Sequence, residues 1–168
     1  FGPDEEPDIP YHCVTRAGAG FQIDFLAMIG TEDFARMDEA KKSALLESRI
    51  LLDCTGEWAA LRRELEPLAE REIAKLMDDS LGYAGYLLSD YKKDRWERRD
   101  AYPQLQENLD TAVRLAVRCL YYANGRYAPA EDRRLYYSFG LENLPAGYEA
   151  LMRELGCRDL FSLEDYRR

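Results

Sequence analysis

Two short runs near the start of the chain alternate hydrophobic and polar side chains with a period of two, which is typical of β-strands. The runs cover residues 11–16 and 21–28; in the second, Ile23 and Phe25 lie on one face and Asp24 on the other. The four residues between the runs include two glycines, which permit the positive φ of a tight turn. We therefore predict a β-hairpin. A lone hairpin is marginally stable in water, so further strands or a helical layer should cover it.

Hydrophobic residues recur at three- and four-residue spacing from Thr31 onward, and this spacing predicts helices. The first helix should begin at Thr31, a good capping residue, and run to about Ser48. The apolar residues 50–53 that follow are predicted to form a brief strand and a turn. Pro67 then interrupts a helical stripe, so we expect a break near Glu66.

The longest predicted helix lies in the second half of the chain. It should begin at Pro103, which suits the first turn of a helix, and end at residues 124–125, because asparagine and glycine tolerate the left-handed conformation of a helix end. Two shorter helices are predicted beyond it, one over residues 129–137 and one after Pro145. In the last of these helices, Leu151 is expected to face inward.

These elements predict a mostly α-helical fold with a small β part. The architecture is a β-hairpin followed by a bundle of about five or six helices. The change of periodicity also divides the chain into two expected domains, residues 1–54 and residues 55–168, of which the second is the helical bundle domain.

The composition is that of a soluble globular protein. Of the 168 residues, 46% are hydrophobic and 33% are charged, and 23 basic against 32 acidic side chains give a net charge of −9. No apolar run approaches the roughly 20 residues that span a bilayer, so we expect no membrane partner. The acidic balance argues against broad nucleic-acid binding, because such binding needs lysine and arginine to neutralise phosphates.

The four cysteines lie far apart in the sequence, at positions 13, 54, 119 and 157, and His12 is the only histidine. A structural zinc site is therefore not expected, because zinc needs four cysteine or histidine ligands in close pairs. A mechanism that uses a histidine base has equally little support. We interpret the cysteines as buried free thiols of a cytoplasmic protein.

Asp24 is the first candidate for chemistry. It lies in the middle of a predicted strand, where aspartate is uncommon because its short side chain competes with the strand for hydrogen bonds. One interpretation is a magnesium ligand, since Mg²⁺ prefers carboxylate oxygens together with substrate phosphates. The other is a solvated residue on the open face of an edge hairpin. The strand pattern alone does not decide between them.

An aromatic and basic stretch, residues 121–137, is the second candidate. Tyrosine rings can stack on a base or sugar, and the arginine fork fits phosphate oxygens. The alternative is a bundle whose helix ends are covered by amphipathic side chains. A smaller basic cluster around Lys92 is explained equally well by a solvated helix face. The candidate contacts in the longer stretch are Arg126, Tyr127, Arg133 and Arg134.

Several short segments resemble one known family. Residues 21–26, Phe-Gln-Ile-Asp-Phe-Leu, resemble the strand that carries the third metal-binding carboxylate of polymerase-beta-like nucleotidyltransferases. Residues 49–56 are similar to the ILYD-x-x-G segment that follows this strand in proteins similar to bacterial aminoglycoside nucleotidyltransferases. Residues 121–129 resemble the ALN-x-x-Y-x-P helix end in the helical C-terminal domain of that group, and residues 144–149 fit the same pattern.

The resemblance implies a fold and an activity. Residues 1–54 would be the C-terminal part of a catalytic domain, and the activity would transfer a nucleoside monophosphate from a nucleoside triphosphate to the hydroxyl of a small-molecule acceptor. In this family carboxylates hold Mg²⁺, so Asp24 would be a metal ligand and a catalytic residue. The substrate contacts implied in this chain are Lys92, Arg126, Tyr127, Arg133 and Arg134.

The sequence also departs from the family. Members carry a Gly-Ser motif and an Asp-x-Asp pair before the third carboxylate, and this sequence contains neither, nor an initiating methionine. One carboxylate cannot build a two-metal site. We therefore expect the C-terminal portion of a nucleotidyltransferase that is inactive by itself. The alternative is a non-catalytic helical interaction or regulatory module, and either protein can form a homodimer.

Overall fold

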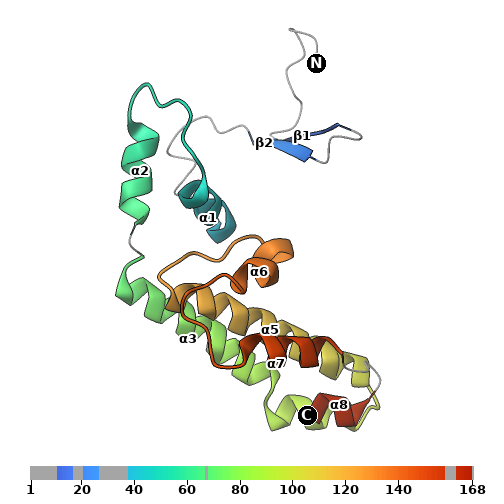
Figure 1. Cartoon of the computed structure of the whole chain (residues 1–168). Helices are drawn as coiled ribbons and strands as arrows, with labels where there is room; N and C mark the ends of the chain where they lie inside the picture. The colour runs from blue at the N-terminus through green and yellow to red at the C-terminus, as the bar shows by residue number, and fades with distance from the viewer. Residues whose placement is uncertain (1–10, 17–20, 27–37, 67, 158–161, 168) are drawn as a thin grey trace.

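The computed structural model describes residues 11–16, 21–26, 38–66, 68–157 and 162–167. This part of the chain is mostly helical, as the sequence predicts (Figure 1). Two strands precede the helices, β1 (Tyr11–Arg16) and β2 (Phe21–Leu26), and they pair antiparallel with Cys13 opposite Asp24. The expected start of the first helix at Thr31 and the glycine turn between the strands lie outside the described residues.

The first two helices are α1 (Glu39–Glu47) and α2 (Glu57–Leu65). The strand predicted over residues 50–53 is wrong, because these residues form a loop in which Leu51 and Leu52 are each 80% exposed. The reason is Asp53, whose carboxylate accepts hydrogen bonds from the N–H groups of Gly56 at 3.0 Å and Ala59 at 2.9 Å. These bonds satisfy the free donors at the start of α2 and turn the chain into that helix.

The helical stripe breaks where proline predicts. Helix α2 ends at Leu65, Glu66 has an extended backbone, and α3 (Glu70–Leu87) begins beyond it, which confirms the expected break near Glu66. Ser89 then starts α4 (Asp90–Glu97), because its hydroxyl accepts a hydrogen bond from the Lys92 N–H at 3.4 Å.

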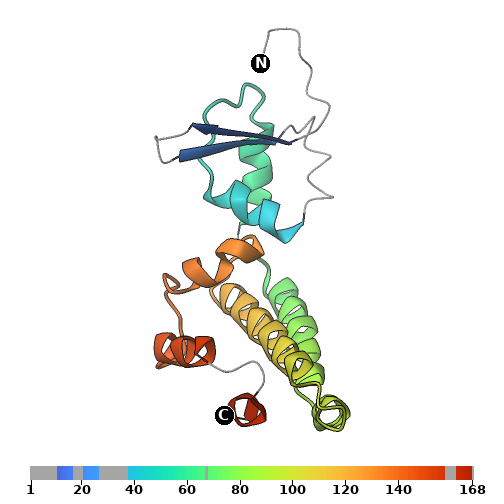
Figure 2. The ribbon, with the colours of Figure 1, turned by 90° about the vertical axis from the view of Figure 1, so that its right-hand side faces the viewer.

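The longest helix of the described chain is α5 (Tyr102–Ala123), with Pro103 in its first turn. Asn124 caps its end and Gly125 has a φ of +67°, so the prediction at residues 124–125 is confirmed. Helices α3 and α5 lie side by side and antiparallel in both views (Figures 1 and 2).

Three short helices complete the described chain, α6 (Glu131–Ser138), α7 (Tyr148–Gly156) and α8 (Leu163–Arg167). Tyr148 of α7 is buried, and its hydroxyl lies 2.7 Å from that of Ser138. The prediction that Leu151 faces inward is wrong, since this side chain is exposed. Tyr148 and Met152 are the α7 side chains that pack on the core cluster beside α5, and Leu151 is not part of that cluster.

The core lies on two faces of α5. On one face Val117 and Tyr121 pack with Leu141 and Tyr148, and on the other Cys119 and Tyr122 pack with residues that include Leu68. The second cluster also receives Leu46 from α1, so α1 is joined to the helical part by apolar packing. None of the described helices combines the length and the apolar character that a membrane crossing requires.

The cysteines only partly match the prediction. Cys119 is a buried free thiol, as expected, and its burial raises its pKa. Cys54 and Cys157 are also free thiols, but they are exposed rather than buried. Cys54 is in the loop that Asp53 turns and Cys157 caps the end of α7, so neither lies on a packed face. The side chain of Cys13 lies outside the described residues.

Candidate functional site

A mostly buried carboxylate joins α1 to the end of α5. Glu39 accepts a hydrogen bond from Arg118 Nε at 2.7 Å and another from the Ala128 N–H at 2.8 Å. The side chain of Glu39 is 15% exposed and that of Arg118 is 31% exposed. Arg118 is on α5, and Ala128 is in the segment that follows α5. The Glu39 side chain therefore fixes α1 both to α5 and to that segment.

Tyr122 lies beside this carboxylate. Its hydroxyl is buried and forms no hydrogen bond within the part of the chain that the structure describes. Burial raises the pKa of Tyr122, and the negative charge of Glu39 raises it further. The Arg118 guanidinium lies 5.6 Å from the centre of the Tyr122 ring, which holds the ring and the ion pair together.

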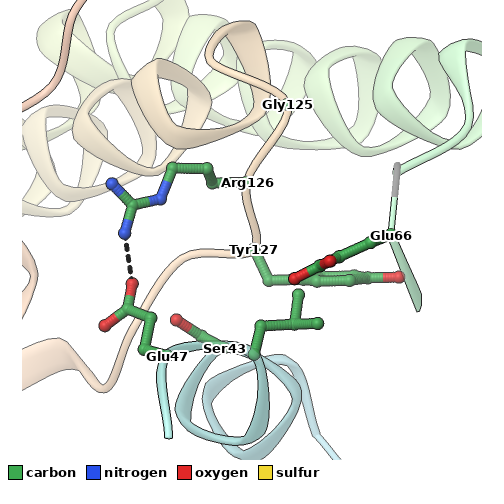
Figure 3. Close-up of a pocket in the computed structure, with 7 residues that line it drawn as sticks. Ser43, Glu47, Glu66, Gly125, Arg126 and Tyr127 are labelled. Carbon is green, nitrogen blue, oxygen red and sulfur yellow. Dashed lines mark hydrogen bonds and ion pairs between the residues drawn. The ribbon is translucent and has the colours of Figure 1, made fainter. Parts of the chain in front are cut away.

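An open groove of about 480 Å³ separates α1 from the segment that follows α5 (Figure 3). Across it the guanidinium of Arg126 points to the carboxylate of Glu47 and forms an ion pair with it. Both side chains of this pair are about half exposed, at 48% and 47%. The groove is lined by Ser43, Leu46, Glu47, Glu66, Gly125, Arg126 and Tyr127.

Tyr127 forms a fixed wall of this groove. The residue is buried, and its hydroxyl donates a hydrogen bond of 3.3 Å to Glu72 Oε1 of α3. The ammonium of Lys42 lies 5.4 Å from the centre of the ring. Burial raises the pKa of Tyr127 to about 12, with a further contribution from the charge of Glu72. The phenol therefore stays neutral over the ordinary pH range.

A second groove of about 260 Å³ adjoins the first, and Ser43 and Glu47 line both. Arg133 and Tyr137 of α6 line this second groove. The Arg133 guanidinium is exposed and lies 3.5 Å from the carboxylate of its neighbour Asp132. Glu47 is therefore placed between two grooves, each of which carries an arginine.

Arg134 and Lys92, two other predicted substrate contacts, lie elsewhere. Arg134 donates to the carbonyl oxygen of Pro129, from Nε at 3.3 Å and from Nη2 at 3.2 Å, so its guanidinium holds the segment that leads into α6. Lys92 is on α4, with its ammonium 4.6 Å from the centre of the Tyr86 ring. Tyr127 contacts Glu72 near the start of α3, whereas Lys92 comes after the last residue of α3. The two residues are therefore about 20 Å apart along the axis of that helix.

Asp24, the predicted magnesium ligand, is on β2, but its side chain lies outside the described residues. Among the side chains that are described, no three or more of His, Cys, Asp and Glu gather in a way that could hold a metal ion. The described carboxylates near the groove, Glu47 and Glu66, instead pair with arginines. The described side chains therefore do not fit a magnesium centre, and a metal at Asp24 remains a prediction of the resemblance.

Glu39 and Glu47, whose ion pairs connect α1 to the end of α5, are not among the residues predicted from the sequence. They are the first and last residues of α1 and its only acidic ones, and nothing in the local pattern says that their partners lie on α5 and just beyond it. The sequence does carry one signal of these contacts. Glu39 and Glu47 are eight residues apart, and so are their partners Arg118 and Arg126.

Comparison with known proteins finds no family model, no curated protein and no solved structure that matches this chain. The described part of the chain is a mostly helical protein with a pair of arginine-bearing grooves between its first helix and the segment that follows α5.

Proposed function

We propose that this chain is the C-terminal portion of a nucleotidyltransferase and that the two adjoining grooves contact its substrates. The observation that carries the proposal is the placement of Arg126 and Arg133 on either side of Glu47. Arg126 lies within residues 121–129, the segment that resembles the helix end of the nucleotidyltransferase helical domain, and Arg133 follows that segment. Guanidinium groups in an open groove are suited to phosphate oxygens.

The proposal assigns different roles to the candidate residues. Arg126 and Arg133 contact phosphoryl or acceptor oxygens, and Tyr127 gives the groove a rigid aromatic wall. Arg134 positions the segment between α5 and α6 through Pro129 and does not contact substrate. Asp24 supplies one carboxylate to magnesium in the longer protein, where the resemblance implies further carboxylates.

The test is nucleotide transfer by a longer protein that contains this sequence. Asp24→Asn should abolish transfer at saturating Mg²⁺, because the amide removes the negative charge while keeping the shape of the side chain. Arg126→Gln should reduce transfer by about tenfold or more, through loss of charge-assisted hydrogen bonds. A matched control is Glu97→Gln, which removes an ion pair with Arg167 between α4 and α8. Near-normal transfer by the Asp24→Asn enzyme would refute the assignment.

A second candidate function, a helical interaction module, is favoured by the surface of α6 and α7. Leu135, Tyr136 and Phe139 of this region are exposed, as is Leu151. Leu135 and Phe139 line a groove of about 370 Å³ together with Met152 of α7. Exposed apolar side chains in one area are typical of binding surfaces. A stable dimer by light scattering, with no thermal shift on addition of nucleoside triphosphate and Mg²⁺, would favour this function.

A further inference from the structure

Two ion pairs of equal spacing connect α1 to the end of α5, and they differ sharply in burial. Glu39 pairs with Arg118 and Glu47 pairs with Arg126, in each case across 79 residues of sequence. The carboxylate of Glu39 is 15% exposed, whereas that of Glu47 is 47% exposed. The inner pair is therefore shielded from water, and the outer pair is open to competition from dissolved ions.

Helix α1 does not depend on Glu47 for its position. Glu39 holds the start of the helix through Arg118 and the Ala128 N–H. Leu46 packs on the apolar cluster beside α5, and Ser43 of the same helix is buried. Half-exposed ion pairs contribute at most a small part of folding stability. Release of Arg126 from Glu47 would therefore leave the groove and its walls in place.

The contact between Glu47 and Arg126 uses one nitrogen, Nη2, and one oxygen, Oε1. A phosphoryl group can instead accept two parallel hydrogen bonds from a guanidinium, which is the stronger arrangement. Displacement costs little, because the released carboxylate of Glu47 is already half exposed and can be solvated fully. A phosphoryl oxygen is thus able to replace the carboxylate at Arg126.

We propose that Glu47 is a built-in competitor that occupies Arg126 until a phosphoryl group of the ligand displaces it. The inference rests on the proposed function and adds to it the ligand chemistry of the groove, a phosphate or pyrophosphate group. Arg133 lines the adjoining groove, on the other side of Glu47, so a diphosphate that enters has a second guanidinium to contact. Glu47 thereby tunes affinity without touching the ligand.

The other carboxylate of the groove does not act in the same way. Glu66 follows the last residue of α2, and its carboxylate lies 3.7 Å from Arg62 Nε, a cation that is not part of the groove lining. Arg62 also donates a hydrogen bond of 2.7 Å to the carbonyl oxygen of Ser48, and this bond fixes the Arg62 side chain beside the end of α1. Glu66 is therefore neutralised by its own partner, and Glu47 is the carboxylate that competes for Arg126.

The test is the binding of inorganic pyrophosphate to the 168-residue chain, measured by isothermal titration calorimetry without Mg²⁺. Glu47→Gln should tighten binding by about fivefold, the effect expected from removing a competing surface ion pair. Arg126→Gln should abolish the binding that Glu47→Gln strengthens. Unfolding curves of each variant check that the fold is retained.

The matched control is Glu97→Gln, because the pair of Glu97 with Arg167 is also a long-range, partly exposed ion pair and lies on other helices. This variant should bind pyrophosphate as the unmodified chain does. Equal affinity of the Glu47→Gln and unmodified chains, or no pyrophosphate binding by either, overturns the inference. Tightening by Glu97→Gln as well would assign the effect to net charge and would also overturn it.

The calorimetry and the transfer assay fail independently. If Glu47→Gln tightens pyrophosphate binding but the longer protein transfers no nucleotide, the proposed function is wrong and the anion site stands. If transfer depends on Asp24 but pyrophosphate binding is the same in the Glu47→Gln and unmodified chains, the competitor role is wrong and the nucleotidyltransferase assignment stands.

Discussion

Replacing Glu39 by alanine should destabilise the protein strongly, although this residue is one of many acidic side chains. The change leaves the partly buried charge of Arg118 without its partner and leaves the N–H of Ala128, a fully buried residue, without an acceptor. Breaking a buried ion pair costs about 3–5 kcal/mol. Because Arg118 is 31% exposed, water recovers part of this energy, and about 2 kcal/mol remains.

The lost hydrogen bond to Ala128 adds a second cost. A buried N–H group without an acceptor costs about 1–3 kcal/mol, so the total for Glu39→Ala is about 3–5 kcal/mol. For a chain of this size each kcal/mol lowers the melting temperature by about 2–4 °C, which gives a decrease of about 10 °C. Glu39→Gln should cost less, about 2 kcal/mol, because the amide oxygen can still accept one hydrogen bond while the charge is lost.

The assay is urea unfolding followed by circular dichroism, and the structure supplies an internal control. Glu47→Ala removes the outer pair of the same spacing, whose side chains are about half exposed, and should cost less than about 1 kcal/mol. Helix, residue type and partner type are the same, so the difference measures the burial of the Glu39 pair together with its hydrogen bond to the Ala128 N–H. If the two alanine variants differ by less than about 0.5 kcal/mol, the argument from burial is refuted.

Two further predictions concern buried hydroxyls. Burial and Glu72 raise the pKa of Tyr127 from 10.0 to about 12, so its share of stability is complete below pH 10 and is lost as the pH rises to 12. Tyr127→Phe should flatten the alkaline decline of the free energy of unfolding, and an unchanged slope would contradict the raised pKa. Ser138→Ala should cost about 1–2 kcal/mol in urea unfolding, because it removes the hydrogen bonds of this hydroxyl with Tyr148 and with the carbonyl oxygen of Leu135. In the Tyr148→Phe background the same change should cost less than it does alone, and full additivity would show that the two hydroxyls do not interact.

The sequence predicts helix ends well where local chemistry sets them. Pro103 and Gly125 bound α5, because each residue restricts or frees the backbone at its position, and α2 ends at Leu65, close to the break expected near Glu66. The short apolar run at residues 50–53 misleads for the opposite reason. Its leucines suggest a strand, but the hydrogen bonds of Asp53 to residues three and six positions later form a turn.

The candidate site is predictable only in part. Arg126 and Tyr127 are adjacent in the sequence, so a motif can find them together, and both line the same groove. Lys92 is separated from them by the length of α3, a distance that a count of basic residues does not reveal. Glu39 and Glu47 depend on contacts 79 residues away, which only the packing of α1 against α5 creates.

The matched spacing of the two ion pairs has a consequence for how such a chain can vary in length. Glu39 and Glu47 are eight residues apart, and Arg118 and Arg126 have the same interval. A single inserted or deleted residue inside either interval would shift one pair out of reach while the other stayed in place. Homologous chains that keep both pairs should therefore conserve these two intervals without gaps and accommodate changes of length in the roughly 70 residues between them.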